Sequence, residues 1–286
     1  MKYAFIRIHR CQYTITRLCA LLSVSVSGYY DWIDRPISKT KRNNLSLLTK
    51  IRCFYQASRQ PYGSPRIHQD LLAAGEQVSI NRVARLMKAA GIQSKMAKRF
   101  VISTNSKNTL APAPDCLKRA FSTNKPNQAW VSDTTFIRTR QGWLYLATIL
   151  DLYSRQVIGW AMSERNNTKL AVDALRMATG RRRIRSSVIV HSDQGSTYAA
   201  GDYQKLIKQH GMLASMSRKG ECYDNAVAES FFGTLKTEWV DDADYRTIEQ
   251  AKQSLFEYIE VFYNRQRRHS YLGYLSPSEY EQANAL

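Results

Sequence analysis

The sequence has few cysteines and no long apolar run. Its five cysteines among 286 residues form no C-x-x-C pair, and this odd, scattered set predicts reduced thiols instead of disulfides. His9, Cys11 and Cys19 lack a second suitably spaced pair, so no structural zinc is expected. The apolar stretch within residues 16–32 is broken by serines and is too short to span a membrane. Without a signal-peptide pattern, the chain is expected to be cytoplasmic.

Acidic residues are few, and they are distributed unevenly along the chain. The sequence has 42 lysines and arginines against 23 acids, a formal net charge of +19. Residues 1–120 hold 21 of the basic residues and only 5 of the acids, whereas residues 121–286 hold 21 and 18. Such an excess favours a polyanionic partner such as nucleic acid, and a basic surface without that role is the alternative. The asymmetry predicts a basic binding region, followed by a second region in which acidic residues have a function.

Helical patterns fill the first third of the chain. Residues 15–22 and 28–33 flank a serine-rich segment, which is either the turn of a short helix-turn-helix or a loop. Apolar residues at helical spacing predict another helix over residues 45–58. We predict that residues 1–93 form a basic, all-α, helix-turn-helix-like region that binds DNA.

A helical hairpin gives the clearest DNA-binding pattern in this region. Its first helix is predicted over residues 65–74 and stops at Gly75, while Ser79 caps the second helix and Gly91 ends it. Two helices joined by a short turn with a glycine are common in DNA-binding domains, and also in hairpins that bind nothing. The DNA-facing residues predicted on the second helix are Asn81, Arg82 and Arg85.

The remaining chain is predicted to be a linker and an α/β core. Residues 94–128 are rich in Lys, Ser, Thr, Asn and Pro without periodicity, which is typical of a linker. Apolar runs over residues 130–138, 143–152 and 156–163 predict three consecutive strands, and shorter strands and helices alternate after them. We therefore predict that residues 129–286 form a mixed five-stranded sheet flanked by helices, with a C-terminal helical extension.

Two aspartates interrupt the predicted strands. Asp133 lies within WVSDTTF, and Asp193 directly follows VIVHS. A buried carboxylate is costly unless it is hydrogen-bonded or bound to a metal, and a single one is best explained as a turn acid. A third acid changes this interpretation, because 35 residues separate Asp193 from Glu229 on a later helix. The apolar residues Val227 and Phe231 turn Glu229 to the opposite side of that helix.

This D…D-35-E arrangement resembles that of retroviral-type integrases and many bacterial transposases. The surrounding motifs are similar to those of one group, the OrfB transposases of the IS-three family of bacterial insertion sequences. These motifs are W-x-x-D-x-T, ILDLYSRQVIGW, HSDQGSTY, S-x-x-G-x-x-x-DNAVAESFFGTLKTE, YNRQRRHSYLGYLSP and, in the helical part, VSGYYDW and YGSPRIH. The resemblance covers nearly the whole chain and implies a ribonuclease-H-like catalytic core.

The resemblance also implies roles for single residues. Asp133, Asp193 and Glu229 would form the catalytic triad and hold two Mg²⁺ ions, with Mn²⁺ as a substitute. Mg²⁺ prefers hard oxygen ligands, and two such ions can assist phosphodiester cleavage and joining. We assign the bridge between the ions to Asp133, because it lies on the first, central strand. By the same resemblance Asn225 and Lys236 would contact DNA.

The function implied by the resemblance is Mg-dependent cleavage of DNA at insertion-sequence ends, followed by strand transfer. It also implies a multimeric synaptic complex with DNA, an OrfA-type partner or a frameshift fusion with it, and action at the bacterial nucleoid. Two alternatives are a ribonuclease-H-like nuclease that only hydrolyses and a DNA-binding regulator without catalysis.

Several other charged residues have two interpretations. Asp151 either closes a turn with Arg155 or adds a fourth carboxylate to the site. His191 shares a strand face with Asp193 and either packs in the core or assists catalysis. Arg267 and Arg268 are predicted to bind the DNA backbone, and the alternative is a C-terminal segment that packs its tyrosines on the core.

Overall fold

The computed structural model describes residues 1–95, 113–117, 123–185, 187–217 and 225–285. The chain forms two compact units, residues 1–52 and 53–286. No helix among the described residues has the length and apolar character that a membrane span requires.

The first unit is a small helical cluster. Its helices are α1 (Lys2–His9), α2 (Ile15–Leu21), α3 (Val26–Asp34) and the first part of α4 (Lys39–Ala57). A core that includes Ile6, Leu18 and Tyr29 joins the first three helices. Ser25 caps α3, since its hydroxyl accepts a hydrogen bond from the Gly28 N–H at 3.0 Å. The serine-rich segment therefore combines a turn with a helix cap, and α1 was not anticipated from the sequence.

The helical hairpin has the predicted form. Helix α5 (Ser64–Ala73) precedes Gly75, whose φ of 81° suits glycine, and α6 (Ile80–Ala89) begins after Ser79. The Ser79 hydroxyl accepts a hydrogen bond from the Arg82 N–H at 3.4 Å, as expected of a cap. The helix-turn-helix-like prediction for the N-terminal helices is confirmed.

The hairpin belongs to the larger unit, so the chain divides earlier than the expected boundary at residue 93. Two ion pairs explain the difference. Arg66 on α5 lies 3.2 Å from Glu238, and Asp70 on the same helix lies 2.5 Å from Arg268. Tyr62, just before α5, is buried and its ring lies 6.5 Å from that of Phe262.

The core of the larger unit is a mixed five-stranded sheet, as predicted. Its strands are β1 (Ala129–Thr139), β2 (Gly142–Asp151), β3 (Val157–Ser163), β4 (Ile189–Ser192) and β5 (Leu213–Met216). Their spatial order is β3-β2-β1-β4-β5. The first three strands pair antiparallel, whereas β4 is parallel to both β1 and β5. The central strand β1 thus joins the antiparallel and the parallel parts of the sheet.

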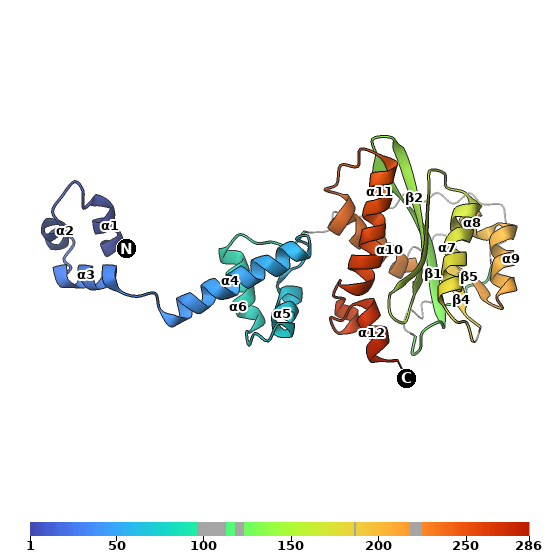
Figure 1. Cartoon of the computed structure of the whole chain (residues 1–286), viewed down its shortest axis with the longest axis horizontal. Helices are drawn as coiled ribbons and strands as arrows, with labels where there is room; N and C mark the ends of the chain where they lie inside the picture. Colours follow the sequence, from blue (N-terminus) through green and yellow to red (C-terminus); the bar gives the residue numbers. More distant parts are fainter. Residues whose placement is uncertain (96–112, 118–122, 186, 218–224, 286) are drawn as a thin grey trace. The chain divides into compact units, whose positions relative to one another are not determined.

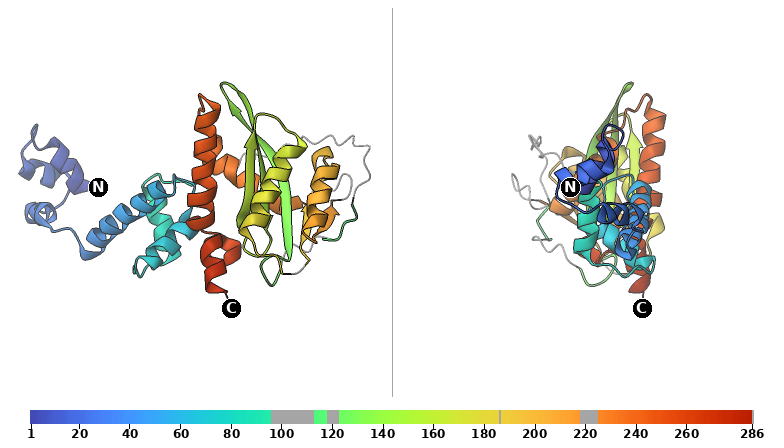
Figure 2. Two further views of the ribbon diagram at one scale, coloured as in Figure 1. Left: turned by 45° about the vertical axis from the view of Figure 1, so that its right-hand side comes forward. Right: turned by 90° about the vertical axis from the view of Figure 1, so that its left-hand side faces the viewer.

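Helices cover both faces of the sheet (Figure 1, with further views in Figure 2). One face packs against α7 (Thr168–Arg181), beside which lie the short α8 (Ser196–Ala199) and α9 (Gly201–Gln209). On the other face α10 (Ala226–Leu235) and α11 (Ile248–Phe256) pack against β1. These two helices continue as the π-helical segments η2 (Lys236–Val240) and η3 (Glu257–Tyr263), and the 3₁₀ turn η4 (Ser270–Leu272) and α12 (Pro277–Ala283) follow.

Most of the expected linker over residues 94–128 lies outside the described residues. A described piece, residues 113–117, packs along β5. The Cys116 N–H donates a hydrogen bond to the Ser215 hydroxyl at 2.9 Å, and Leu117 is buried. This piece therefore belongs to the packed core.

Gly159 on β3 permits the close approach of α7 to the sheet. A Cβ atom there would collide with the Ala174 carbonyl oxygen and lie 2.8 Å from the Ala178 Cβ. We predict that Gly159→Ala lowers the free energy of unfolding by about 1–3 kcal/mol, because backbone must move to admit the methyl group. Urea denaturation measures this change. The control is Gly180→Ala on α7, where a Cβ meets nothing within 4 Å; equal destabilisation by both variants would contradict the explanation.

Candidate active site

Sheet register brings the two predicted aspartates together. In the parallel pair of β1 and β4, Val131 lies opposite His191. Two residues further along each chain, Asp133 and Asp193 follow on the same face, at the end where β4 stops. Carboxyl ends of parallel strands are where α/β proteins commonly place their ligands.

The like charges of this cluster affect one another. Burial and then the nearby Asp193 raise the pKa of Asp133 to about 8, and Glu229 adds to this effect. The Thr134 N–H, which donates to Asp133 Oδ1 at 2.7 Å, and the charge of Lys236 oppose the rise. The charges of Asp193, Glu229 and Lys236 therefore all act on Asp133.

Glu229 comes from the first turn of α10, which packs against β1. Phe231 is buried as expected, but Val227 is only partly buried. The buried face of the helix consists of Ala228, Phe231, Phe232 and Leu235. Glu229 remains half-buried outside this face, and burial raises its pKa. The predicted orientation of Glu229 away from the apolar face therefore holds with a slightly different set of core residues.

Asn225 and Lys236 lie at the two ends of α10. Asn225 occupies the N-cap position, is buried, and makes no side-chain capping bond. Its Oδ1 has no hydrogen-bond partner among the described residues, which do not include residues 218–224. Lys236 Nζ lies 5.1 Å from the centre of the Phe136 ring. The charge of Lys236 acts on Asp133, whereas Asn225 lies at the start of the helix that carries Glu229, and DNA contact by either residue stays a prediction.

Two residues that sequence reasoning did not single out lie beside the aspartates, and one of them, Gly195, bonds Asp193. The Gly195 N–H donates to Asp193 Oδ1 at 2.9 Å. Tyr198 is buried, its hydroxyl lies 2.9 Å from Thr134 Oγ1, and the charges of Asp133 and Asp193 contribute, after burial, to raising its pKa. The sequence motif HSDQGSTY contains both residues, but from this motif only Asp193 was predicted to be a site residue.

His191 and Asp151 have structural contacts. The His191 ring is buried, with Nδ1 2.9 Å from the Ser215 hydroxyl, and its charge lowers the pKa of Asp193 against the larger effect of burial. Asp151 accepts hydrogen bonds from the Asn127 N–H at 2.9 Å and the Tyr153 N–H at 3.0 Å. Burial raises the pKa of Asp151 to about 6. Asp151 thus closes a turn through backbone groups.

The structure gives Arg267 and Arg268 contacts other than the expected DNA backbone. The Arg267 side chain is 5% exposed and forms two hydrogen bonds to Glu238, at 2.6 and 2.7 Å. The Arg268 guanidinium donates to Asp70 at 2.5 Å and to the Tyr274 carbonyl oxygen at 3.1 Å. Both guanidinium groups pair with carboxylates of the protein, which favours the alternative of a C-terminal segment that packs on the core, and DNA-backbone binding by these arginines stays a prediction.

The predicted residues of the hairpin lie at the surface. On α6, Asn81 and Arg85 are exposed and Arg82 is partly exposed, whereas Val83 and Met87 are buried. The helix therefore turns its apolar face inward and presents the predicted polar set to solvent.

The acidic cluster suits a hard cation in its chemistry. It supplies carboxylate oxygens, the ligands that Mg²⁺ prefers, and the raised pKa of Asp133 shows negative charge that a cation would offset. Among the described residues, no three His, Cys, Asp or Glu side chains are arranged closely enough to hold a metal ion as they stand. The sheet register brings Asp133 and Asp193 together, and Glu229 lies on α10, which packs against β1.

Comparisons with known proteins agree with this architecture. Two models described as "Integrase core domain" match residues 123–222 and 229–284, and one described as "HTH-like domain" matches residues 41–100. The Escherichia coli K12 protein "Transposase InsF for insertion sequence IS3A" is 40% identical over 286 residues, with 99% of both chains covered. The chain belongs to the IS3 family of transposases.

Further relatives and structures show the range of this similarity. "Insertion element IS600 uncharacterized 31 kDa protein" of Shigella sonnei is 42% identical over 265 residues, which cover 93% of this chain and 97% of the relative. A simian T-cell lymphotropic virus intasome chain is 14% identical, with a TM-score of 0.48 and coverage of 79% and 72%. The HTLV-2 integrase catalytic core in complex with magnesium is also 14% identical, with a TM-score of 0.39 and coverage of 51% and 92%.

The raised pKa of Asp133 predicts that the stability of this IS3-family transposase falls as the pH rises. The folded protein holds the proton of Asp133 more tightly than the unfolded chain, since its pKa rises from 3.8 to about 8. Ionising Asp133 therefore costs stability, and the loss grows as the pH rises from about 4 to about 8. We expect Asp133→Asn to raise the free energy of unfolding in EDTA by ~2–4 kcal/mol at pH 8.5 and little at pH 4.

Urea denaturation at the two pH values measures this difference. Asp244→Asn is the control, because Asp244 is exposed and hydrogen bonding with Arg140 lowers its pKa. A destabilised Asp133→Asn variant at pH 8.5 would contradict the electrostatic argument.

Gly195 provides a test of how Asp193 is positioned. A Cβ atom at Gly195 would lie 2.9 Å from Asp193 Oδ1, so Gly195→Ala must displace the carboxylate. We expect the DNA cleavage rate to fall about ten- to hundredfold with little change in melting temperature. Gly201→Ala, where a Cβ meets nothing within 4 Å, should retain the full rate. A fully active Gly195→Ala variant would show that this contact does not position Asp193.

Proposed function

We propose that this transposase cleaves DNA at the ends of an insertion sequence and joins the resulting 3′ ends to target DNA, with Asp133, Asp193 and Glu229 as catalytic residues. The observation that carries the proposal is the sheet register, which brings Asp133 on β1 beside Asp193 after β4, with the Glu229 helix packed on β1. The proposal assigns these three acids to one site, and it is supported by the repulsion between Asp133 and Asp193, which has no structural benefit.

The reaction consists of two in-line displacements at phosphorus. Water attacks the phosphodiester at the element end and leaves a 3′-hydroxyl, and this hydroxyl then attacks a phosphodiester of the target. Two Mg²⁺ ions, when bound, supply charge neutralisation for the attacking and leaving oxygens. Asp133, Asp193 and Glu229 would hold these ions, with Asp133 as the shared ligand, and Mn²⁺ would substitute.

The protein's own groups position these acids and the DNA. The Thr134 and Gly195 N–H groups fix one oxygen of Asp133 and of Asp193, respectively. Lys236 adds a positive charge beside Asp133 that can contact a DNA phosphate. Asn225 contributes a buried amide at the start of the Glu229 helix, which the proposal assigns to the DNA substrate.

DNA binding also involves the helical hairpin in this proposal. Asn81, Arg82 and Arg85 on α6 are the residues assigned to DNA contact, and their surface positions support the assignment. Arg267 and Arg268 are left out, because both pair with carboxylates of the protein. An OrfA-type partner, multimeric assembly on the element ends, and action in the bacterial cytoplasm complete the proposal.

A strand-transfer assay with labelled element ends and Mg²⁺ tests the proposed chemistry. We expect Glu229→Gln to reduce joined product about a thousandfold or more, because the amide no longer supplies a charged ligand. Glu249→Gln on α11 is the matched control, since Glu249 is an exposed helical acid that pairs only with Lys252 among its described ion pairs. The reactions are run with and without an OrfA-type partner.

The outcomes separate the proposal from its alternatives. Cleaved ends without joined product, under both conditions, would indicate a nuclease that only hydrolyses. Joining by Glu229→Gln at the wild-type rate would show that the active site is assigned wrongly. Binding to element ends with no cleavage or joining by the wild type would indicate a DNA-binding regulator.

A further inference from the structure

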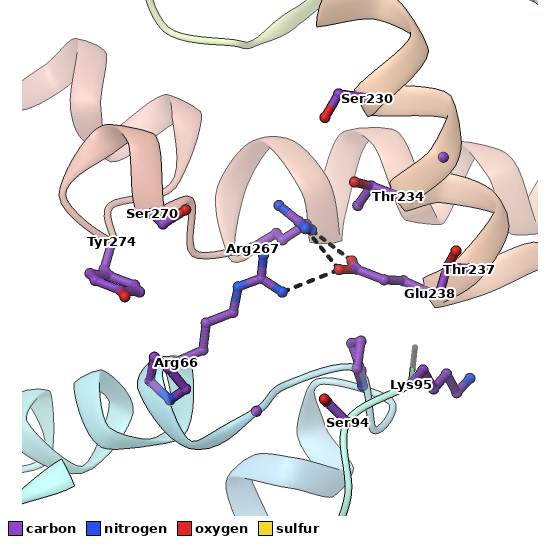
Figure 3. A pocket seen from close by; sticks show the side chains of 14 residues that line it. Arg66, Ser94, Lys95, Ser230, Thr234, Thr237, Glu238, Arg267, Ser270 and Tyr274 are labelled. Atoms are coloured by element: carbon purple, nitrogen blue, oxygen red, sulfur yellow. Dashed lines mark hydrogen bonds and ion pairs between the residues drawn. The ribbon is translucent and has the colours of Figure 1, made fainter. Parts of the chain in front are cut away.

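A polar cavity of about 610 Å³ adjoins the active-site helix within the larger unit (Figure 3). The start of α5 lines one side, with Arg66, and Lys95 lies nearby after α6. Ser230, Thr234 and Thr237 line the other side from α10 and its π-helical continuation. These residues lie in none of the strands, and none is among the acids of the candidate active site.

The three hydroxyl residues form a row on one helix face. They are spaced by four and three residues, which places their side chains one above another. Ser230 directly follows Glu229, so this face is next to the one that carries the glutamate. A hydroxyl row of this kind offers neutral hydrogen-bond donors to oxygen acceptors.

The lining of the cavity has an excess of positive charge. Glu238 accepts two hydrogen bonds from Arg267 and one, at 3.2 Å, from Arg66. The single negative charge of Glu238 is thus shared by the guanidinium groups of Arg66 and Arg267, and one positive charge remains unbalanced. Burial, and then the charge of Arg267, lower the pKa of Arg66, as expected of a cation that is incompletely neutralised.

Lys95 and the start of α5 add to this charge. Lys95 Nζ lies 2.9 Å from Asp242, but the Asp242 side chain is 68% exposed, so water screens this pair. The N-cap residue of α5 is Gly63, which lines the cavity and supplies no capping side chain, and the first turn holds no acid. The positive end of this ten-residue helix therefore points at the cavity without a protein anion of its own.

We propose that this cavity binds a phosphodiester group of the DNA substrate, at a distance from the bond that reacts. Hydroxyl donors on one side and cations with a helix N-terminus on the other match the oxygens and charge of a phosphate. The single acid in the lining, Glu238, is already occupied by two arginines, which disfavours a cationic ligand. The inference rests on the proposed function, since it assigns the DNA of that reaction to a second contact.

Two variants test this contact in different ways. Lys95→Gln removes a charge, and we expect about fivefold weaker binding of element ends at 0.15 M salt, with the log–log salt dependence shallower by about 0.9. Thr234→Val keeps the side-chain volume and removes a hydroxyl, so binding should weaken about tenfold while the salt slope stays unchanged. Fluorescence anisotropy with labelled element ends over a range of salt measures both quantities.

Lys252→Gln is the matched control. Like Lys95, Lys252 is about one-third exposed or less and pairs with an exposed acid, Glu249, but it does not line this cavity. The inference is overturned if Lys95→Gln has the salt slope of Lys252→Gln, or if Thr234→Val binds as tightly as the wild type. Circular dichroism melting of each variant confirms that the fold is retained before binding is compared.

Two further measurements distinguish a failure of this inference from a failure of the proposed function. Wild-type strand transfer together with an inactive Glu229→Gln supports the proposed function whatever the cavity variants do. If phosphate added at constant ionic strength raises the melting temperature of the wild type and not of Lys95→Gln, while both bind DNA equally, the cavity takes a free anion and the assignment to DNA is wrong.

Discussion

Repulsion between the carboxylates of Asp133, within β1, and Asp193, just after β4, is the physical constraint at the centre of the larger unit. β1 is the only described strand that pairs antiparallel on one side and parallel on the other, and this places Asp133 beside Asp193. α10 packs on the same strand and adds Glu229. Burial increases the repulsion, because less water screens the charges. Two backbone N–H donors and the charge of Lys236 reduce the cost of this repulsion, and the raised pKa of Asp133 reflects the part that remains.

The sheet could be predicted because its signal is local. Alternating apolar runs mark β1, β2 and β3, and short connections between them leave an antiparallel meander as the simplest pairing. The acids Asp133, Asp193 and Glu229 were identified by spacing and by resemblance, and the sheet register explains the meeting of the first two. Gly195 lies within the motif HSDQGSTY, but the motif does not show its role, since that role lies in a hydrogen bond to Asp193 that appears only in the folded turn.

The roles of the C-terminal arginines could not be predicted from the sequence. A run such as NRQRRHS is typical of an exposed basic segment, because arginine is costly to bury without a partner. The partner of Arg267 is Glu238, 29 residues earlier, and the partner of Arg268 is Asp70, 198 residues earlier. Pairs at such separations leave no trace in composition or periodicity. Losing one member would leave a buried charge unpaired, which is usually more costly than the pair is stabilising.

These same ion pairs explain why the hairpin belongs to the larger unit, and they also limit how α10 can move. A helix turns by about 100° per residue, so one short helix can carry several different faces. Ala228, Phe231 and Leu235 fix α10 in the core, Glu229 lies outside this buried face, and Ser230 begins the hydroxyl row of the cavity. Glu238, in the continuation of the helix, is held by Arg66 and Arg267. A ligand in the cavity would therefore act on the element that carries Glu229, and the catalytic acid and the second contact would be positioned together.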